Sequence, residues 1–402
     1  MSVSRDSFSR RDLFALSAIA AGALAPERTE AAVQSGSAPA SPVSVAKVRS
    51  YDEDLVAQFT TMFDQIGGIG HLVKGKTVAM KLNLTGSGRF EGFTVGQTHW
   101  CHPKVVGALT AVFGKLGAKR IRLLESAGRK QGVLLEDKFL SGGWDVSALK
   151  NAAPLVEFED TNTLGEGKQY STLKVKTKPY IFPAYNVNHS YEDCDFFVSV
   201  GKMKNHEELG ITMSMKNLFG ITPTALYGGR EQIFHYGTVQ SPSGVPAELD
   251  PKSDRYEGWR MPRLVTDICG ARPIDLAVLD GIESCVGGEG PWCLGSKPVK
   301  PALLLVGRNC VCTDAVGAAT MGYNPRASRH EPPYRVYKDT KNHPPGQLIP
   351  PGETHQYADN MMLLAEAVGM GTADLSKIDV RGVPIKDALF DFEAFWKGQM
   401  RV

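Results

Sequence analysis

The stretch that decides the fold is DFFVSVGKMKNHEELGITMSMKNLFGITPT, residues 195–224. Its first six residues form an apolar run that is typical of a buried β-strand. Polar side chains then follow: Lys202, Lys204, His206, Lys216 and Asn217. In open α/β sheets, ligands bind just beyond the carboxyl ends of the strands. The sequence therefore predicts a site for an anionic ligand at the end of this strand.

A solvated loop is the ordinary explanation for lysines after a strand, because lysines are usually exposed. Here Met213, Met215 and Leu218 make the same segment apolar, which indicates packing against the protein. A charged lysine beside such a run must reach solvent, an acidic partner or a ligand. Both explanations stay open on the sequence, and the ligand site is favoured.

Apolar periodicity predicts alternating strands and helices along the chain. Strands are expected at 77–84, 118–124, 155–158, 195–200, 274–279 and 303–306, and helices at 103–116, 262–269, 314–321, 360–370 and 388–400. Pro103 suits the first turn of its helix. The alternation predicts an α/β fold, with a mostly parallel sheet and helices on both faces.

Charged and polar groups recur where these predicted strands end. Lys81 and Asn83 end the first strand, and Asp280 follows the strand 274–279. Because parallel strands share one carboxyl edge, we expect these groups to converge. Lysines neutralise anionic ligands, and neighbouring carboxylates either bind a divalent metal or position the lysines. A desolvated lysine near another cation also acts as a base or nucleophile.

The predicted site divides into three groups by role. The catalytic candidates are His206, Lys216 and Lys204. The ligand-binding candidates are Lys81, Asn83, Lys202, Asn217 and His102. The metal-binding candidates are Asp280 and Glu289, the latter set between two glycines. For Asp314, helix capping is at least as good an explanation as metal binding.

These motifs resemble the signature of the domain of unknown function 362 family. The resemblance rests on Lys202-x-Lys204-x-His206, Lys216-Asn217-Leu218-Phe219-Gly220, Lys81-x-Asn83, His102-Pro103, Glu125-Ser126, Asp280-Gly281-Ile282, Gly288-Glu289-Gly290-Pro291 and Asp314-Ala315-Val316. It covers most of residues 75–325. Leu82 stands where the family has a proline. The resemblance implies a fold and a site more readily than a reaction.

The N-terminus carries a second signal. Residues 9–14, SRRDLF, contain paired arginines and precede a modest apolar run over 13–25. This pattern predicts a twin-arginine signal peptide over 1–31, a flexible spacer over 32–48 and a domain over 49–402. We therefore expect the twin-arginine export machinery as a partner and a periplasmic or otherwise exported location. That route often carries folded proteins with a cofactor already inserted, which favours a divalent metal or an organic cofactor here.

Composition narrows the function classes. The net charge of +2 gives no argument for nucleic acid, and no apolar run after the signal is long enough to span a membrane. None of the seven cysteines forms a Cys-x-x-Cys pair, so a ferredoxin-type cluster motif is absent. In an exported protein, disulfides are the ordinary expectation for some of them. Metal binding by Cys293, Cys310 or Cys312 stays open.

Together these patterns predict an exported enzyme that binds an anionic substrate or cofactor. Redox chemistry is favoured because proteins exported by this route are rich in it. One alternative is a non-catalytic periplasmic binding protein for a metal or an anionic small molecule. The other is a cofactor-dependent isomerase or hydrolase. A proline-rich excursion over 325–351 and helices at the C-terminus complete the predicted domain.

Overall fold

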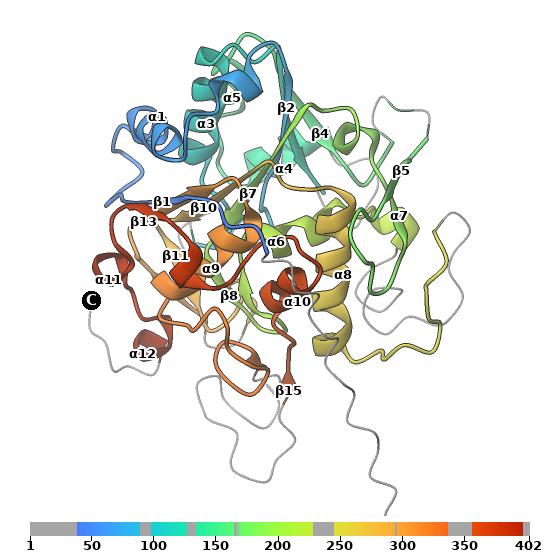
Figure 1. Cartoon of the computed structure of the whole chain (residues 1–402). Coiled ribbons are helices and arrows are strands. Elements are labelled where there is room, and N and C mark those ends of the chain that lie inside the picture. The colour runs from blue at the N-terminus through green and yellow to red at the C-terminus, as the bar shows by residue number, and fades with distance from the viewer. Residues whose placement is uncertain are drawn as a thin grey trace, which may run out of the picture. The chain divides into compact units, whose positions relative to one another are not determined.

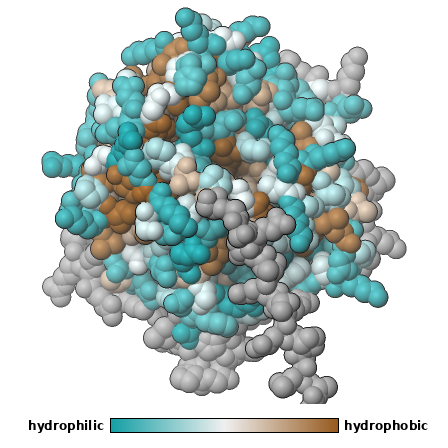
Figure 2. Space-filling view, in the orientation of Figure 1, coloured by the Kyte–Doolittle hydropathy of each residue, from teal (hydrophilic) through white to brown (hydrophobic). Residues whose placement is uncertain are grey.

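The computed structural model describes residues 38–88, 98–126, 134–164, 167, 169–227, 245–293, 296–336 and 356–396. The predicted signal peptide, residues 1–31, lies outside them, as do residues 337–351 of the predicted proline-rich excursion. Within these ranges, no helix is both long and apolar enough to cross a membrane. On the face seen in Figure 2, hydrophilic side chains alternate with small separate hydrophobic areas.

The described part of the chain is built on an eight-stranded central sheet (Figure 1). In spatial order the strands are β16 (Val380–Gly382), β1 (Val43–Lys47), β13 (Leu303–Gly307), β10 (Leu276–Gly281), β7 (Phe196–Lys202), β2 (Thr77–Lys81), β3 (Arg120–Glu125) and β4 (Val156–Asp160). The run from β10 to β4 is parallel throughout. Only β13 is antiparallel to its neighbours in this described sheet. The prediction of a mostly parallel α/β fold is confirmed.

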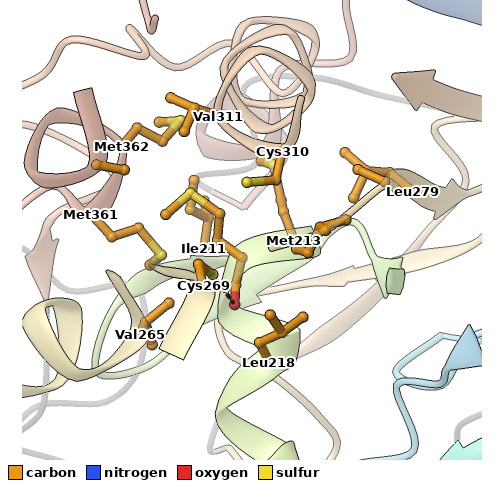
Figure 3. Close-up of a cluster of buried hydrophobic side chains, with 14 of the residues drawn as sticks. Ile211, Met213, Leu218, Val265, Cys269, Leu279, Cys310, Val311, Met361 and Met362 are labelled. Atoms are coloured by element: carbon orange, nitrogen blue, oxygen red, sulfur yellow. Dashed lines mark hydrogen bonds between the residues drawn. The ribbon is translucent and has the colours of Figure 1, made fainter. Parts of the chain in front are cut away.

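Two hydrophobic cores lie on opposite faces of this sheet. One packs under α1 (Leu55–Gln65) and α3 (Pro103–Lys115), and the other under α6 (Ser214–Asn217), α8 (Glu257–Ala271), α9 (Cys310–Thr320) and α10 (Met361–Ala367). Strand β13 shows the alternation: Leu304 and Val306 belong to the first core, and Leu303 and Leu305 to the second. Figure 3 shows part of the second core, where α6, α8 and α9 meet. Each such buried side chain contributes about 1.5–3 kcal/mol.

Shorter elements connect and cover the sheet. They are α2 (Gly70–Val73), α4 (Leu135–Ser141), α5 (Val146–Lys150), β5 (Ser171–Lys174), β6 (Ala184–Val187), η1 (His189–Tyr191), β8 (Lys204–His206), β9 (Gly210–Thr212), η2 (Leu218–Ile221), α7 (Thr224–Tyr227), β11 (Ser284–Val286), β12 (Lys297–Val299), β14 (Arg335–Val336), β15 (Gln356–Tyr357), η3 (Leu375–Lys377), α11 (Ile385–Ala388) and α12 (Phe392–Trp396). The hairpins β8–β9 and β11–β12 follow β7 and β10, so both extend the carboxyl edge of the sheet.

The structure corrects the predicted boundaries at both ends of the domain. Val43–Lys47 belongs to the central sheet as β1 and not to a flexible spacer over 32–48, because its alternating apolar residues pack into the core. The single helix predicted over 388–400 is also wrong. The chain breaks between α11 and α12, where the backbone amides of Phe390 and Phe392 bond to the end of α9.

The cysteines differ from expectation as well. Cys310 and Cys312 are both buried and lie in the first turn of α9. All seven cysteines are free thiols in the structure, and Cys194 is the only one that is not buried. The expected disulfides are therefore not formed in this structure.

Candidate functional site

The predicted site residues do converge on the carboxyl edge of the parallel strands. Lys81 ends β2, Glu125 ends β3 and Lys202 ends β7. Asp280 is the last residue but one of β10, and its Cα pairs with that of Lys202. The side chains nevertheless separate into distinct groups with different partners.

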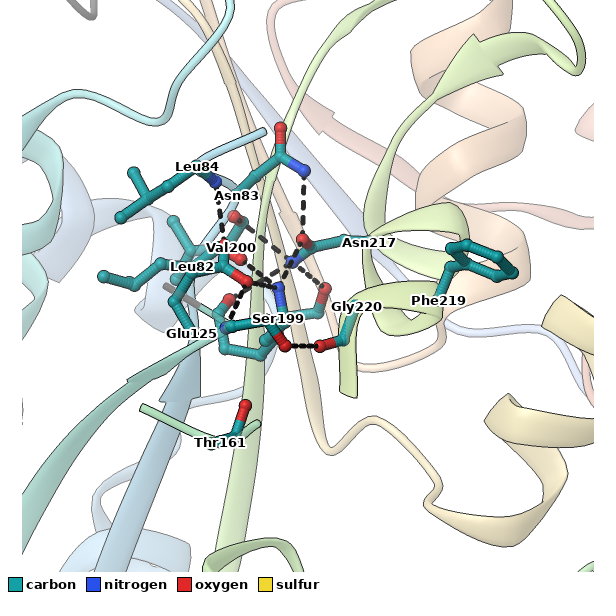
Figure 4. A network of polar contacts seen from close by, with 12 residues as sticks. Leu82, Asn83, Leu84, Glu125, Thr161, Ser199, Val200, Asn217, Phe219 and Gly220 are labelled. Atoms are coloured by element: carbon teal, nitrogen blue, oxygen red, sulfur yellow. Dashed lines mark hydrogen bonds and ion pairs between the residues drawn. The ribbon is translucent and has the colours of Figure 1, made fainter. Parts of the chain in front are cut away.

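The first group is a buried polar network around Lys81 (Figure 4). Its Nζ lies 2.6 Å from Glu125 Oε1, and the two side chains are only 2% and 6% exposed. Glu125 also accepts hydrogen bonds from the backbone amides of Leu84 and Ser126, both at 2.8 Å. Lys81 donates further to the carbonyl of Leu82 at 2.6 Å. The charge of Lys81 is thus neutralised within the protein.

Asn217 links this network to α6. Its Oδ1 accepts from Asn83 Nδ2 at 3.1 Å and from Lys81 Nζ at 3.3 Å. Its Nδ2 donates to Ser199 Oγ at 3.0 Å and to the carbonyl of Lys81 at 3.2 Å. Asn83 Oδ1 is a buried acceptor with no hydrogen-bond partner in the described part of the chain. Asn217 therefore positions α6 against the sheet, whereas Asn83 keeps a buried oxygen that no described residue satisfies.

The second group is a fully buried ion pair. Lys202 Nζ lies 3.0 Å from Asp280 Oδ2, and neither side chain is exposed. Tyr51 accepts from Lys202 at 2.9 Å and donates to Asp280 Oδ1 at 3.1 Å. The backbone amide of His102 bonds to Asp280 Oδ2 at 2.9 Å. Through these contacts Asp280 has a structural role, because it holds Lys202, Tyr51 and the start of α3 together.

His102 begins α3 and packs beside that ion pair. Its ring stacks on Tyr51 with centroids 3.6 Å apart, and its Nδ1 accepts the backbone amide of Lys104 at 3.2 Å. Burial lowers the pKa of His102 to about 4, so the imidazole is neutral near pH 7. Pro103 follows in the first turn, where its missing amide hydrogen costs nothing. His102 serves here as a helix cap.

The third group joins the hairpin β8–β9 to the glycine-rich loop at 287–290. Lys204 Nζ donates to the backbone carbonyls of His99 and Glu289, at 2.7 and 2.6 Å. His206 Nδ1 accepts the backbone amides of Glu208 and Leu209, at 3.1 and 3.3 Å. Burial lowers the pKa of His206, with the charge of Glu289 opposing. Both predicted catalytic residues thus hold local backbone in place.

Lys216 differs from these three lysines. It lies on α6, is partly buried, and its Nζ sits 4.5 Å from the centroid of the Phe219 ring. Among the described residues it has no hydrogen-bond or ion-pair partner. Burial lowers the pKa of Lys216 to about 8; Glu289 opposes this shift, and Lys204 and Lys81 add to it. The site therefore holds one lysine whose amine is not committed to the fold.

Asp314 fixes the start of the helix that carries Lys216. Its Oδ1 accepts the backbone amide and the hydroxyl of Ser214, at 3.0 and 2.6 Å, and its Oδ2 accepts the amide of Met215 at 2.9 Å. Burial raises the pKa of Asp314 to about 7. Asp314 therefore acts as a helix cap, but not for its own helix. It lies within α9, which is capped by Asn309, and its carboxylate caps α6.

Replacing Asp314 by asparagine tests this capping role. One amide NH₂ would then face a backbone N–H donor, so we expect the free energy of unfolding to fall by about 1–3 kcal/mol. Urea denaturation followed by circular dichroism measures the change. The control is Asp52→Asn, at a side chain that is 81% exposed, where the free energy of unfolding should hardly change. Equal stabilities of the two variants would contradict the assignment.

Two features of the site were missed by the sequence reasoning. The first is Tyr51, which contacts both Lys202 and Asp280. It follows the predicted spacer closely in sequence, and the alternating apolar residues of Val43–Lys47 before it could have indicated a strand that leads to the site. Glu207 directly follows His206 in the lysine motif. In the structure Glu207 approaches Glu289 and Cys293, and one ligand atom from each lies within 4.8 Å of the others. Within the described residues, these three side chains are the group that could hold a metal ion.

Comparison with known proteins places this fold and site in a family. The model of the family "Domain of unknown function (DUF362)" matches residues 78–319, which is more than half of the chain. A thylakoid-associated protein from Synechocystis sp. is 28% identical over 252 residues, which cover 62% of this chain and 65% of that protein. The match therefore spans less than two thirds of that relative's length.

Solved structures give a weaker likeness. A protein from Thermotoga maritima aligns over 60% of this chain and 52% of its own, with 14% identity and a TM-score of 0.34. The lactate racemase apoprotein from Thermoanaerobacterium thermosaccharolyticum aligns over 61% and 50%, with 14% identity and a TM-score of 0.36. Neither likeness supports a conclusion about activity. The family match covers the strands, hairpins and helices that build the site, and the chain belongs to the DUF362 family.

Proposed function

We propose that this protein is an enzyme that binds a small anionic substrate and removes a proton from it with the amine of Lys216. The observation that carries the proposal is the amine of Lys216, which makes no hydrogen bond or ion pair with the described residues. The amines of Lys81, Lys202 and Lys204 all make such contacts. Those lysines are held by Glu125, Asp280 and backbone carbonyls. Leaving an amine unpaired in a partly buried position costs stability, and groups of this kind are concentrated at functional sites.

The lowered pKa of Lys216 suits it to act as a base. At pH 7.4 a pKa of about 8 leaves about a fifth of the amines neutral, against about one in a thousand for an ordinary lysine. General bases are most effective when their pKa lies near the working pH. In its protonated form the same amine attracts an anion, as does the neighbouring charge of Lys204, which is held by backbone carbonyls and not by a carboxylate.

The buried acceptor of Asn83 adds a second contact for the substrate. Its Oδ1 lacks a partner within the described ranges and sits on the side of Asn83 away from Asn217 (Figure 4). A hydroxyl or amine on the substrate would satisfy it. The sequence favoured redox chemistry because of the predicted export route. The geometry of Lys216 supports acid–base chemistry, which we propose in its place.

A proton-exchange screen tests this function and does not require the product to be identified. Small carboxylates and phosphates with an acidic C–H bond are incubated with the protein in D₂O and followed by proton NMR. We expect the protein to accelerate deuterium incorporation into one chemical class. Binding without exchange would instead support the non-catalytic binding protein. If no compound in the panel binds or exchanges, that result contradicts the proposal of a small anionic substrate.

The pH dependence of exchange follows from the same amine. Below pH 8 most Lys216 amines are protonated and cannot accept a proton, so the exchange rate should rise roughly tenfold per pH unit towards about 8 and then level off. Affinity for the anion should stay nearly constant up to about pH 8 and fall above it, because the attracting charge is lost there. A rate that does not change between pH 6 and 9 would exclude Lys216 as the base.

We also propose that the chain is exported by the twin-arginine route, on the support of the SRRDLF motif at 9–14. Replacing Arg10 and Arg11 by lysine should retain the protein in the cytoplasm of its host. Cell fractionation and immunoblotting measure this. A variant that is exported as well as the natural sequence would contradict the route.

A further inference from the structure

We infer that Glu207, Glu289 and Cys293 form a binding site for a divalent transition metal of the zinc class. The three side chains come from two separate loops. Glu207 lies at the tip of the β8–β9 hairpin, and Glu289 and Cys293 lie in the loop between β11 and β12. One ligand atom from each lies within 4.8 Å of the others. A thiolate with two carboxylates gives three protein ligands and leaves a fourth position open, as in catalytic zinc sites.

The two loops are held together by contacts that leave these ligands adjacent. The backbone amide of Glu207 donates to Glu289 Oε2 at 3.0 Å, and Lys204 Nζ donates to the carbonyl of Glu289 at 2.6 Å. Gly288 allows the close approach of Cys293, since a Cβ at Gly288 would lie 2.6 Å from Cys293 Sγ. Gly288 also has a φ of 154°, which disfavours any other residue. Only glycine at position 288 therefore leaves room for the Cys293 side chain.

Two carboxylates lie beside the thiol, and a divalent cation between these side chains would offset their negative charge. Cys293 is 5% exposed, and its Sγ lies 3.8 Å from Glu207 Oε2. A thiol that coordinates a divalent metal loses its proton. Binding forms an S–metal bond and releases the thiol proton to solvent. His206 Nδ1 lies 3.9 Å from Glu289 Oε2 but accepts two backbone amides, and Lys204 Nζ donates to the backbone carbonyls of His99 and Glu289.

One buried polar atom of the β8–β9 hairpin lacks a hydrogen-bond partner among the described residues. Thr212 Oγ1 is buried and has no hydrogen-bond partner in the part of the chain that is described. Thr212 pairs across the hairpin with Lys204, so the two side chains share a face. Lys204 reaches Glu289 from that face. Thr212 Oγ1 therefore lies on the face of the hairpin from which the Lys204 side chain holds the Glu289 loop.

Cobalt binding to the purified, untagged full chain tests the site. We expect one Co²⁺ per chain and a near-ultraviolet thiolate-to-cobalt charge-transfer band, with Zn²⁺ displacing the cobalt. Cys293→Ser should abolish the band, and Glu207→Gln should retain it while weakening affinity by roughly 10- to 100-fold or more. The control is Cys194→Ser. Cys194 is the one cysteine of the seven that is not buried, and this variant should bind Co²⁺ as the natural protein does.

Each outcome decides the inference independently of the proton-transfer proposal. No cobalt binding by the natural chain would overturn it, as would a band that survives in Cys293→Ser. Glu207→Gln keeps nearly the same shape, so it tests the site even where Cys293→Ser does not fold. Unchanged affinity in Glu207→Gln would also overturn it. Exchange activity of the metal-free chain bears only on Lys216.

Discussion

Replacing Asp280 by alanine should lower the free energy of unfolding by about 3–5 kcal/mol. The substitution leaves the ammonium of Lys202 without its counter-ion in a position with no solvent exposure. It also removes the acceptor for Tyr51 and for the backbone amide of His102. Because a domain is typically stable by only about 5–15 kcal/mol, this loss is a large fraction of the total. Urea denaturation followed by circular dichroism measures it.

Two comparisons separate the lost ion pair from a general effect of substitution. Asp52 forms a surface ion pair with Lys104, with side-chain exposures of 81% and 54%, so Asp52→Ala should hardly lower the free energy of unfolding. The double variant Lys202→Met/Asp280→Leu removes both charges, and it should recover most of the stability lost in Asp280→Ala. If Asp280→Ala were no less stable than Asp52→Ala, the structural role given to Asp280 would be wrong.

The sequence predicted the sheet well because each strand carries its own local pattern. The alternation of apolar residues located β2, β7, β10 and β13 to within a few residues. The strand β1 was missed for a related reason. Its flanks are rich in serine, alanine and proline, which are typical of a spacer, and this masked the alternating VSVAK of Val43–Lys47. Packing against β13 decides that these residues form a strand.

The partners of the charged residues could not be predicted in the same way, because they depend on register between strands. Asp280 lies opposite Lys202 in the pairing of β10 with β7, although 78 positions separate them in the chain. Glu125 reaches Lys81 across the parallel pair β2–β3. A lysine motif predicts positive charge at the end of a strand. Which lysine keeps a free amine is decided only by these pairings.

Replacing Lys216 by methionine should reduce the rate of proton exchange by about 10²–10⁴-fold, the usual contribution of a general base. Methionine retains much of the length and apolar stem of lysine, so packing against Phe219 is largely kept. Within the described residues the amine makes a cation–π contact with Phe219 and no hydrogen bond or ion pair, so its removal should change stability little. Deuterium incorporation into the substrate class found by the screen measures the rate. Lys119→Met, at an exposed lysine, is the control.

Arginine at position 216 separates proton transfer from anion binding. A guanidinium keeps its charge at all relevant pH values, so Lys216→Arg should bind the anion but not accept a proton. We therefore expect affinity within about tenfold of the natural protein and a rate as low as in Lys216→Met. A rate in Lys216→Arg close to that of the natural protein would show that the positive charge alone is needed. Lys216 would then be a binding residue, and the base would have to be sought elsewhere in the site.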